Sequence, residues 1–181
     1  MRRTSLIRSF APVADRNARL MILGSMPGAE SLRAGQYYAH PRNAFWRIMG
    51  ELVGASPQLP YGARLRRLQQ AGIALWDVLA ACARAGSLDA AIDERSIIAN
   101  DLVSFLAQHP GITHVYFNGA AAERCFRVHV QPALEADRLQ LRRLPSTSPA
   151  HAALAYAEKL RAWRTILQPP ARQGRTRANK K

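Results

Sequence analysis

The sequence predicts an α/β protein, a three-layer α/β/α sandwich around a central, mostly parallel four-stranded sheet. Short apolar runs, the pattern of buried strands, occur four times in the 181 residues. Segments with apolar residues at helical spacing follow them. Such strand–helix alternation is typical of a parallel sheet with helices on both faces. A chain of this length favours one domain, expected over residues 1–168.

The strands are expected at residues 19–23, 73–75, 113–117 and 138–144, after a basic lead-in of residues 1–17. Five helices are expected, at residues 43 or 44 to about 53, 63–71, 93 or 96 to 109, 120 to about 130, and 148 to about 167. Ser148 suits the N-cap of the last helix, with Pro149 at its first position. Residues 77–91 read as a loop, and residues 169–181 as a disordered basic tail.

The charge of the chain is unusual for a globular protein. It carries 26 Lys and Arg against 12 Asp and Glu, a net charge of +14, and its pI is near 11.2. This favours a polyanionic partner, nucleic acid before anionic membrane. The alternatives are a basic proteome or a basic tail on a neutral domain. The tail holds five of the excess charges, so the body of the chain is basic too: Arg172, Arg175, Arg177, Lys180 and Lys181.

Several classes of site are disfavoured. Cys82 and Cys125 cannot form a four-thiolate centre and are expected to be buried free thiols. No His, Cys and Glu cluster has metal-ligand spacing, so neither a metal nor a cofactor is expected. Gly-x-Ser-x-Gly and phosphate-binding P-loop motifs are absent from the sequence. No apolar run reaches membrane-spanning length and no signal peptide is recognised, so a cytoplasmic protein is expected. The chain is also expected to be a monomer.

The stretch from Gly24 to Trp46 is the most informative part of the chain. It follows the first strand and reads GSMPGAESLRAGQYYAHPRNAFW. Long loops in compact domains are usually functional or disordered, and its aromatic residues argue against disorder. Tyr37 and Tyr38 in a basic protein suit base stacking, although one ring is expected to anchor the loop to the core. Asn43 could orient a water or read a base edge, or could only cap the next helix.

All four expected strands end in polar or glycine-containing segments. In open parallel sheets, ligands bind beyond the carboxyl ends of the strands. The sequence therefore predicts a cleft where these ends meet. Each segment also has a structural explanation, since Asn-Gly is usually a turn and Ser148 a helix cap. A capped helix start can nevertheless also bind phosphate. The four segments are Gly24–Gly28, Trp76-Asp77, Asn118-Gly119 and Ser146–Ser148.

These residues resemble motifs of the uracil-DNA glycosylase superfamily, most closely its hypoxanthine-DNA (DNA-deoxyinosine) glycosylase branch. The first motif is Gly-Ser-Met-Pro-Gly at residues 24–28, followed by Tyr-Tyr-x-His-Pro-x-Asn-x-Phe-Trp at residues 37–46. Leu-Trp-Asp-Val at residues 75–78, Phe-Asn-Gly at residues 117–119 and Pro-Ser-Thr-Ser-Pro-Ala at residues 145–150 fall where that branch has its other motifs. The resemblance covers roughly residues 19–167.

The resemblance implies an enzyme that flips a deaminated base out of double-stranded DNA and hydrolyses its N-glycosidic bond without a metal. Met26 stands where mismatch-specific relatives have a water-positioning Asn. In the hypoxanthine branch the Asn of the His-Pro-x-Asn segment takes the catalytic place, and the resemblance carries that role over to Asn43. The implied base-binding residues are Ser25, Met26, Tyr38, Trp76, Asp77 and Asn118. The implied DNA-backbone and wedge loop is Ser146, Thr147, Ser148, Pro149 and Ala150, which lacks the His of standard uracil enzymes.

Three other functions are compatible with the sequence to different degrees. A mismatch-type uracil-DNA glycosylase would use the same fold. A non-catalytic nucleic-acid-binding domain would bind in a salt-sensitive way and leave no alkali-labile strand product. A small-molecule hydrolase is disfavoured by the positive charge and by the missing nucleophile motif.

Overall fold

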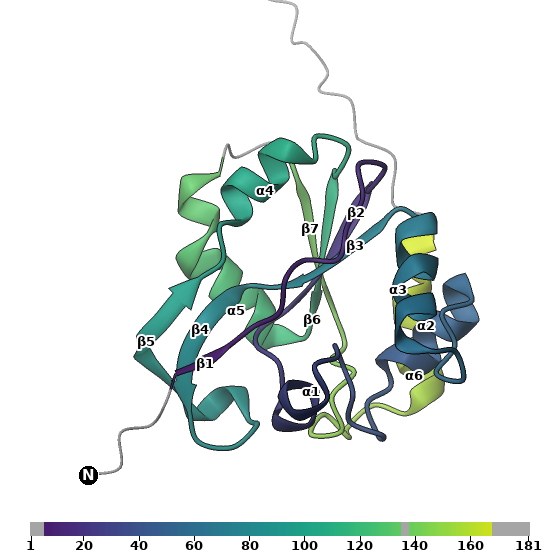
Figure 1. Cartoon of the computed structure of the whole chain (residues 1–181), viewed down its shortest axis with the longest axis horizontal. Coiled ribbons are helices and arrows are strands. Elements are labelled where there is room, and N and C mark those ends of the chain that lie inside the picture. The colour runs from purple at the N-terminus through teal and green to yellow at the C-terminus, as the bar shows by residue number, and fades with distance from the viewer. Residues whose placement is uncertain (1–5, 135–137, 168–181) are drawn as a thin grey trace, which may run out of the picture.

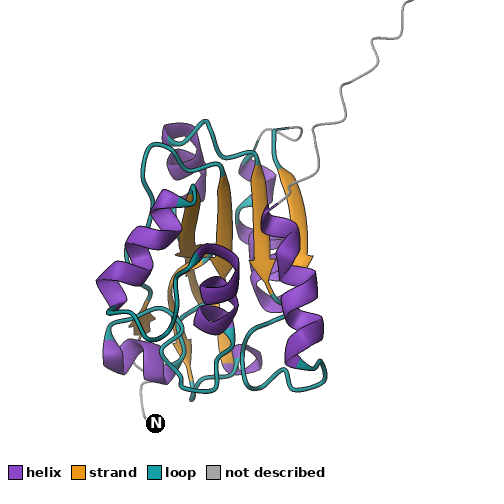
Figure 2. Cartoon of the chain, turned by 90° about the vertical axis from the view of Figure 1, so that its right-hand side faces the viewer, coloured by secondary structure: helices purple, strands orange, loops and turns teal. Residues whose placement is uncertain are grey.

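The computed structural model describes residues 6–134 and 138–167. Its centre is a four-stranded parallel sheet with strand order β3-β2-β6-β7. The strands are β2 (Leu20–Gly24), β3 (Ile73–Asp77), β6 (His114–Asn118) and β7 (Gln140–Leu144). They lie within a residue or two of the positions that the apolar runs predict, and all pairings are parallel. Their carboxyl ends lie at one edge of the sheet (Figures 1 and 2).

Helices cover both faces of this sheet, which confirms the predicted three-layer α/β/α architecture (Figure 1). On one face lie α2 (Phe45–Val53), α3 (Tyr61–Gln70) and α6 (Tyr156–Trp163), and on the other α4 (Leu102–Gln108) and α5 (Ala120–His129). Alternate residues of β2 supply the two cores: Leu20 and Ile22 pack on the α2 side, Met21 and Leu23 on the α5 side. All five residues of β2 are buried, as expected for a strand covered on both faces.

A second sheet replaces part of the predicted loop at residues 77–91. In it, β1 (Leu6–Arg8), β4 (Leu79–Arg84) and β5 (Ile92–Ala99) pair antiparallel in the order β1-β4-β5. The predicted helix start at Asp93 or Ser96 is therefore wrong. The helix begins at Leu102, after Asp101, whose carboxylate accepts a hydrogen bond from the Ser104 N–H at 3.0 Å. Burial of Leu79, Ala81 and Cys82 accounts for a strand with such small residues.

Two further predictions about the helices need correction. The stretch from Gly24 to Trp46 contains a short helix, α1 (Ala29–Ala34), which ends at Gly35 with a φ of 62°. The last helix begins at Tyr156 and not at Ser148. The Ser148 hydroxyl instead accepts from the Ala150 N–H at 3.2 Å. Short 3-10 turns, η1 (Asp89–Ala91), η2 (Gln131–Ala133) and η3 (Arg164–Leu167), complete the fold. The tail predicted at residues 169–181 lies outside the described residues.

Candidate active site

A cavity of about 160 Å³ opens where the carboxyl ends of the parallel strands meet, and we call it the edge cavity. Such a volume is below the range of roughly 300–1,000 Å³ that is typical for drug-sized ligands, so it suits a single small ring system. Most of the predicted site residues line it together: Ser25, Met26, Tyr38, Asn43, Asp77, Asn118, Ser146, Thr147, Ser148 and Pro149.

Gly24 and Asp77 form the inner end of the edge cavity. The two residues are partners in the register of β2 and β3. A Cβ atom at position 24 would lie 2.4 Å from the Asp77 Oδ1 atom and 3.0 Å from the Tyr38 hydroxyl. Real Cβ atoms are not found so close to an oxygen, so glycine at this position is what lets Asp77 and Tyr38 approach the end of β2.

Asp77 is a buried carboxyl group, with 3% of the residue exposed. Its Oδ2 atom has no hydrogen-bond partner among the described residues. Burial and the negative charge of Asp89 raise the pKa of Asp77 to about 8, against the opposing effect of the Arg84 guanidinium. Desolvation favours the neutral form of an acid, so Asp77 holds a proton at neutral pH.

Tyr38 adopts a left-handed backbone conformation with a φ of 54°, unusual for a residue other than glycine. Its ring stacks on Phe45 with the ring centres 4.1 Å apart. The Asn118 amide lies close to the Tyr38 hydroxyl and bonds to Thr147 through its oxygen and one of its two N–H groups. No group among residues 6–134 and 138–167 has hydrogen-bond geometry to the Tyr38 hydroxyl. Burial raises the pKa of Tyr38, which therefore stays protonated.

Tyr37 is the ring that anchors the loop. It is 3% exposed, and its hydroxyl donates to the Ala11 carbonyl oxygen at 3.1 Å. The Trp46 indole N–H donates to the Tyr37 carbonyl oxygen at 2.7 Å. This confirms the expectation that one of the two tyrosines fixes the loop to the core, which holds the strained Tyr38 in place.

Asn43 lies at the start of α2 and uses only part of its amide there. Its Oδ1 atom accepts the Phe45 N–H at 3.0 Å, although the N-cap residue of α2 is Ala44 and not Asn43 as predicted. The Asn43 amide nitrogen donates to no residue in the described part of the chain. Asn43 therefore has two donors available at the cavity wall while its oxygen fixes the orientation of the amide plane.

Asn118 holds the 146–150 loop in place. Its Nδ2 atom donates to the Thr147 hydroxyl at 2.8 Å, and its Oδ1 atom accepts the Thr147 N–H at 2.8 Å. The Thr147 carbonyl oxygen in turn accepts the Ala44 N–H at 3.0 Å. Gly119 follows with a φ of 96°, and a side chain there would meet the Ser146 Cβ atom at 2.8 Å. Asn118 thus links the end of β6 to this loop.

The turn between β4 and β5 contacts residues 24–28, and the sequence did not predict this contact. The Ser25 hydroxyl donates to Asp89 Oδ1 at 2.8 Å, and the Ala29 N–H donates to the Ser87 hydroxyl at 3.0 Å. The buried Arg84 side chain donates to the Pro27 carbonyl oxygen at 2.5 Å. Only the Gly86-Ser87 turn signal hinted at this contact, and nothing in the sequence indicated its partner.

Two predicted site residues lie elsewhere. Trp76 points away from the edge cavity, because side chains alternate along β3 and Asp77 faces inward. The Trp76 indole N–H donates to the Phe10 carbonyl oxygen at 2.9 Å, and its ring packs 5.2 Å from that of Phe105. Ala150 is exposed and does not line the cavity.

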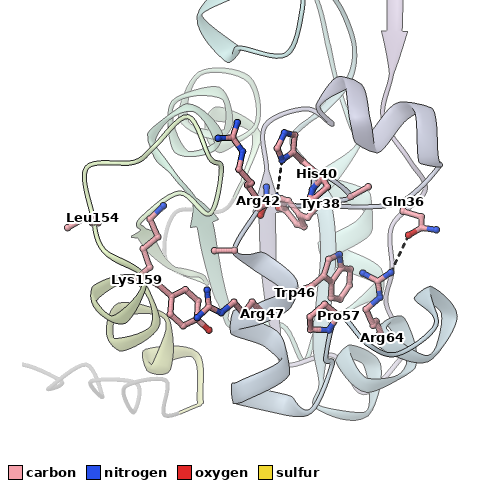
Figure 3. A pocket seen from close by; sticks show the side chains of 15 residues that line it. Gln36, Tyr38, His40, Arg42, Trp46, Arg47, Pro57, Arg64, Leu154 and Lys159 are labelled. Atoms are coloured by element: carbon pink, nitrogen blue, oxygen red, sulfur yellow. Dashed lines mark hydrogen bonds between the residues drawn. The ribbon is translucent and has the colours of Figure 1, made fainter.

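A larger groove of about 530 Å³ adjoins the edge cavity, and we call it the basic groove (Figure 3). The two share Tyr38, His40 and Asn43 as lining residues. The cationic residues that line the basic groove are Arg42, Arg47, Arg64 and Lys159.

Aromatic rings and polar atoms hold several of these cations in place. The Arg47 guanidinium lies 3.7 Å from the centre of the Tyr156 ring, and that of Arg64 lies 4.7 Å from the centre of the Trp46 ring. Lys159 donates to the His151 carbonyl oxygen at 2.7 Å. A groove of this charge, with aromatic walls, suits a polyanionic chain carrying flat groups.

Within the described ranges, no three His, Cys, Asp or Glu side chains gather in a way that could hold a metal ion. None of the helices there is long and apolar enough to span a bilayer. Cys82 and Cys125 are buried free thiols, as predicted.

The fold and the site together define an α/β protein with a base-sized polar cavity at the carboxyl edge of its sheet, opening into a basic groove. The sequence model of the Uracil DNA glycosylase superfamily matches residues 11–167. The chain therefore belongs to the uracil DNA glycosylase superfamily.

Named relatives refine this assignment. The chain is 37% identical over 145 residues to a hypoxanthine DNA glycosylase of Methanosarcina acetivorans, covering 80% of this chain and 87% of the relative. It is 41% identical over 113 residues to a hypoxanthine DNA glycosylase of Methanosarcina barkeri, covering 62% and 70%. A solution NMR structure from Methanosarcina acetivorans, described as a candidate uracil DNA glycosylase, superimposes with a TM-score of 0.71 at 31% identity, covering 90% of this chain and 99% of that one.

Proposed function

We propose that the protein is a DNA repair glycosylase that hydrolyses the N-glycosidic bond of a deaminated base in double-stranded DNA, with hypoxanthine preferred. The superfamily membership and the names of the two Methanosarcina relatives support the reaction and the substrate. The observation that carries the proposal is that Asn43 and Tyr38 line one small cavity, which meets a groove of cations. An extruded base fits such a cavity, and the DNA backbone suits such a groove.

The reaction needs few groups from the protein. Cleavage of the glycosidic bond passes through an oxocarbenium-like sugar while negative charge grows on the departing base. We assign to Asn43 the positioning of the water that attacks C1′, because its amide nitrogen has free donors while its oxygen is fixed on Phe45. The reaction products are the free base and an abasic site.

The other cavity residues bind the base and the strand in this proposal. The Tyr38 ring, held against Phe45, forms the wall on which the base stacks. The base is surrounded at the inner end of the cavity by Ser25, Met26, Asp77 and Asn118. The 146–150 loop holds the backbone beside the flipped nucleotide, because Asn118 and Ala44 fix Thr147 at the cavity rim.

The test is single-turnover cleavage of a duplex with one deoxyinosine by the wild type and by Asn43→Ala. Loss of the positioned water should slow cleavage by at least about 100-fold, on the scale of other single catalytic groups. Asn43→Ser is the matched variant, since its hydroxyl can still accept at the helix start while the amide is lost. Both variants should be slow, with Asn43→Ser the more stable. Wild-type rates in both would remove Asn43 from the mechanism.

A substrate panel tests the base preference in the same assay. Hypoxanthine, uracil and xanthine are placed opposite each normal base, and alkaline strand cleavage reports the abasic product. Hypoxanthine is expected to be released fastest. Faster release of uracil would instead assign a mismatch-type uracil activity. Salt-sensitive binding without any alkali-labile product would identify a non-catalytic DNA-binding domain.

A further inference from the structure

We infer that Asp77 is a second catalytic residue, a neutral carboxylic acid that gives its proton to a ring nitrogen of the leaving purine as the C1′–N9 bond breaks. This inference rests on the proposed function and deepens it, because it states how a poor leaving group is made to depart. A carboxyl group that only maintained the fold would be expected to have its oxygens paired with other parts of the protein.

The position of the carboxyl group carries the inference. Asp77 lines the edge cavity at the end of β3, opposite Gly24. Its Oδ2 atom is buried and has no partner among the described residues. An unpaired buried polar atom is costly to the folded protein. An atom of this kind at the inner end of a cavity is placed to meet a partner that arrives with the ligand.

The charged groups around Asp77 leave its proton in place. Arg84 at the end of β4 and Asp89 in the turn that follows face it, and from the segment after α1 Tyr37 and Tyr38 do so, both protonated phenols. Glu30 and His40 also line the cavity. None of these supplies a cation bonded to the Asp77 carboxyl group within the described chain.

Arg84 is the nearest cation, and it is committed elsewhere. It donates to the Pro27 and Gly86 carbonyl oxygens at 2.5 and 3.1 Å. Its remaining nitrogen faces Asp89 Oδ1 at 3.7 Å. The Arg84 charge thus lies against Asp89. Burial, together with the negative charge of Asp89, raises the pKa of Asp77 to about 8. The electrostatics and the geometry agree on a neutral acid.

The chemistry balances as an acid-assisted hydrolysis. The bonding pair of C1′–N9 passes to the purine, and the Asp77 proton moves to a ring nitrogen of that purine, N7 or N3. Water held by Asn43 adds to C1′ and loses one proton to solvent. After the base leaves, the Asp77 carboxylate takes a proton back from solvent. An ionised Asp77 would instead repel the charge that grows on the base.

The pH dependence of kcat/KM on a deoxyinosine duplex tests the inference, because this parameter reports groups of the free enzyme. For the wild type, kcat/KM should fall about tenfold per pH unit above about pH 8. Asp77→Asn should be about 10²–10⁴-fold slower and lack this descending limb. Asp93→Asn, which alters an exposed carboxylate on β5, is the control and should follow the wild-type profile.

Substrate analogues give a second measurement that a merely structural role would not alter. Duplexes carrying 7-deaza- or 3-deaza-deoxyinosine lack one candidate acceptor nitrogen each. On the analogue that lacks the nitrogen protonated by Asp77, the wild type should cleave slowly, and Asp77→Asn should lower the cleavage rate little further. An equal penalty for Asp77→Asn on all three substrates, with the descending limb retained, would overturn the inference. If wild-type protein releases no hypoxanthine at all, the proposed function fails first and the inference falls with it.

Discussion

The Tyr38 hydroxyl and the Asp77 carboxyl group lie side by side at the inner end of the edge cavity. Both approach the end of β2 so closely because Gly24 has no side chain. Each has a buried oxygen without a hydrogen-bond partner among the described residues. A polar ligand that enters the cavity could pair with both atoms, so the two groups are candidates for ligand contacts.

Tyr38→Phe tests this relationship from the side of the phenol. Removing a buried hydroxyl that has no partner should leave the free energy of unfolding unchanged or raise it by about 1 kcal/mol. Cleavage of the deoxyinosine duplex should nevertheless slow, because the hydroxyl can no longer bind the base. Chemical denaturation and single-turnover kinetics measure the two effects. A variant that is destabilised and fully active would show that the hydroxyl is a structural group.

Gly24→Ala tests the close approach on which the cavity depends. A methyl group 2.4 Å from the Asp77 Oδ1 atom forces the strand ends apart. Overpacking of this kind typically costs about 1–3 kcal/mol. The matched control is Gly28→Ala, because a Cβ atom there has no neighbour nearer than the Ser87 side chain at 4.0 Å. Thermal melts should show a clearly lower melting temperature for Gly24→Ala alone, and this variant should also lose cleavage activity. Equal effects at the two positions would contradict the described geometry.

The stability of the protein should depend on pH through Asp77. A pKa raised from 3.8 to about 8 means that the folded chain keeps a proton that the unfolded chain releases in this window. Stability therefore falls as the pH rises towards about 8, with a slope of at most about 1.4 kcal/mol per pH unit. Asp77→Asn removes this contribution, so its advantage over the wild type should grow with pH. Urea unfolding across the window measures it, and a constant difference would show that Asp77 is ionised in the folded state.

Asn118→Ala should release the 146–150 loop. The variant removes both hydrogen bonds to Thr147, each 2.8 Å long, and should cost about 1–3 kcal/mol of stability. Thr147→Val removes only the hydroxyl partner, and the double variant should cost less than the sum of the single ones. A double-mutant cycle on unfolding free energy and on the affinity for an abasic duplex measures this coupling. Strict additivity would mean that the two side chains act independently.

The parallel sheet and most of the site could be predicted because their signals are local. β2 and β6 are continuous apolar runs, and the polar residues after each strand had to meet at one edge of the sheet. The convergence of Ser25, Asp77 and Asn118 on one cavity follows from that rule. The helix starting at Tyr156 was misplaced because Ser148-Pro149 is a strong cap signal. The structure uses that Ser148 in a turn before the helix.

The second sheet and the surroundings of Asp77 could not be predicted from the sequence. The residues of β4 are mostly small, so nothing local indicates a strand, and β4 is stabilised by pairing with β1 and β5. The contact between Ser25 and Asp89 joins residues 64 positions apart. The neutral state of Asp77 depends on such distant neighbours, and a sequence pattern contains no information about them.

The basic groove should supply a charge-dependent part of DNA affinity. Arg42 and Arg47 are exposed residues that line it, and neutralising a phosphate contact lowers the salt dependence of binding by about one unit of log–log slope. Arg42→Gln and Arg47→Gln should each weaken binding to damaged and undamaged duplexes alike. Arg67→Gln, at an exposed position of α3 outside the groove, is the matched control for charge. If DNA lies along the groove, Arg67→Gln should keep the wild-type salt dependence of binding. If Arg67→Gln lowers that salt dependence as much as the groove variants do, DNA lies across another face.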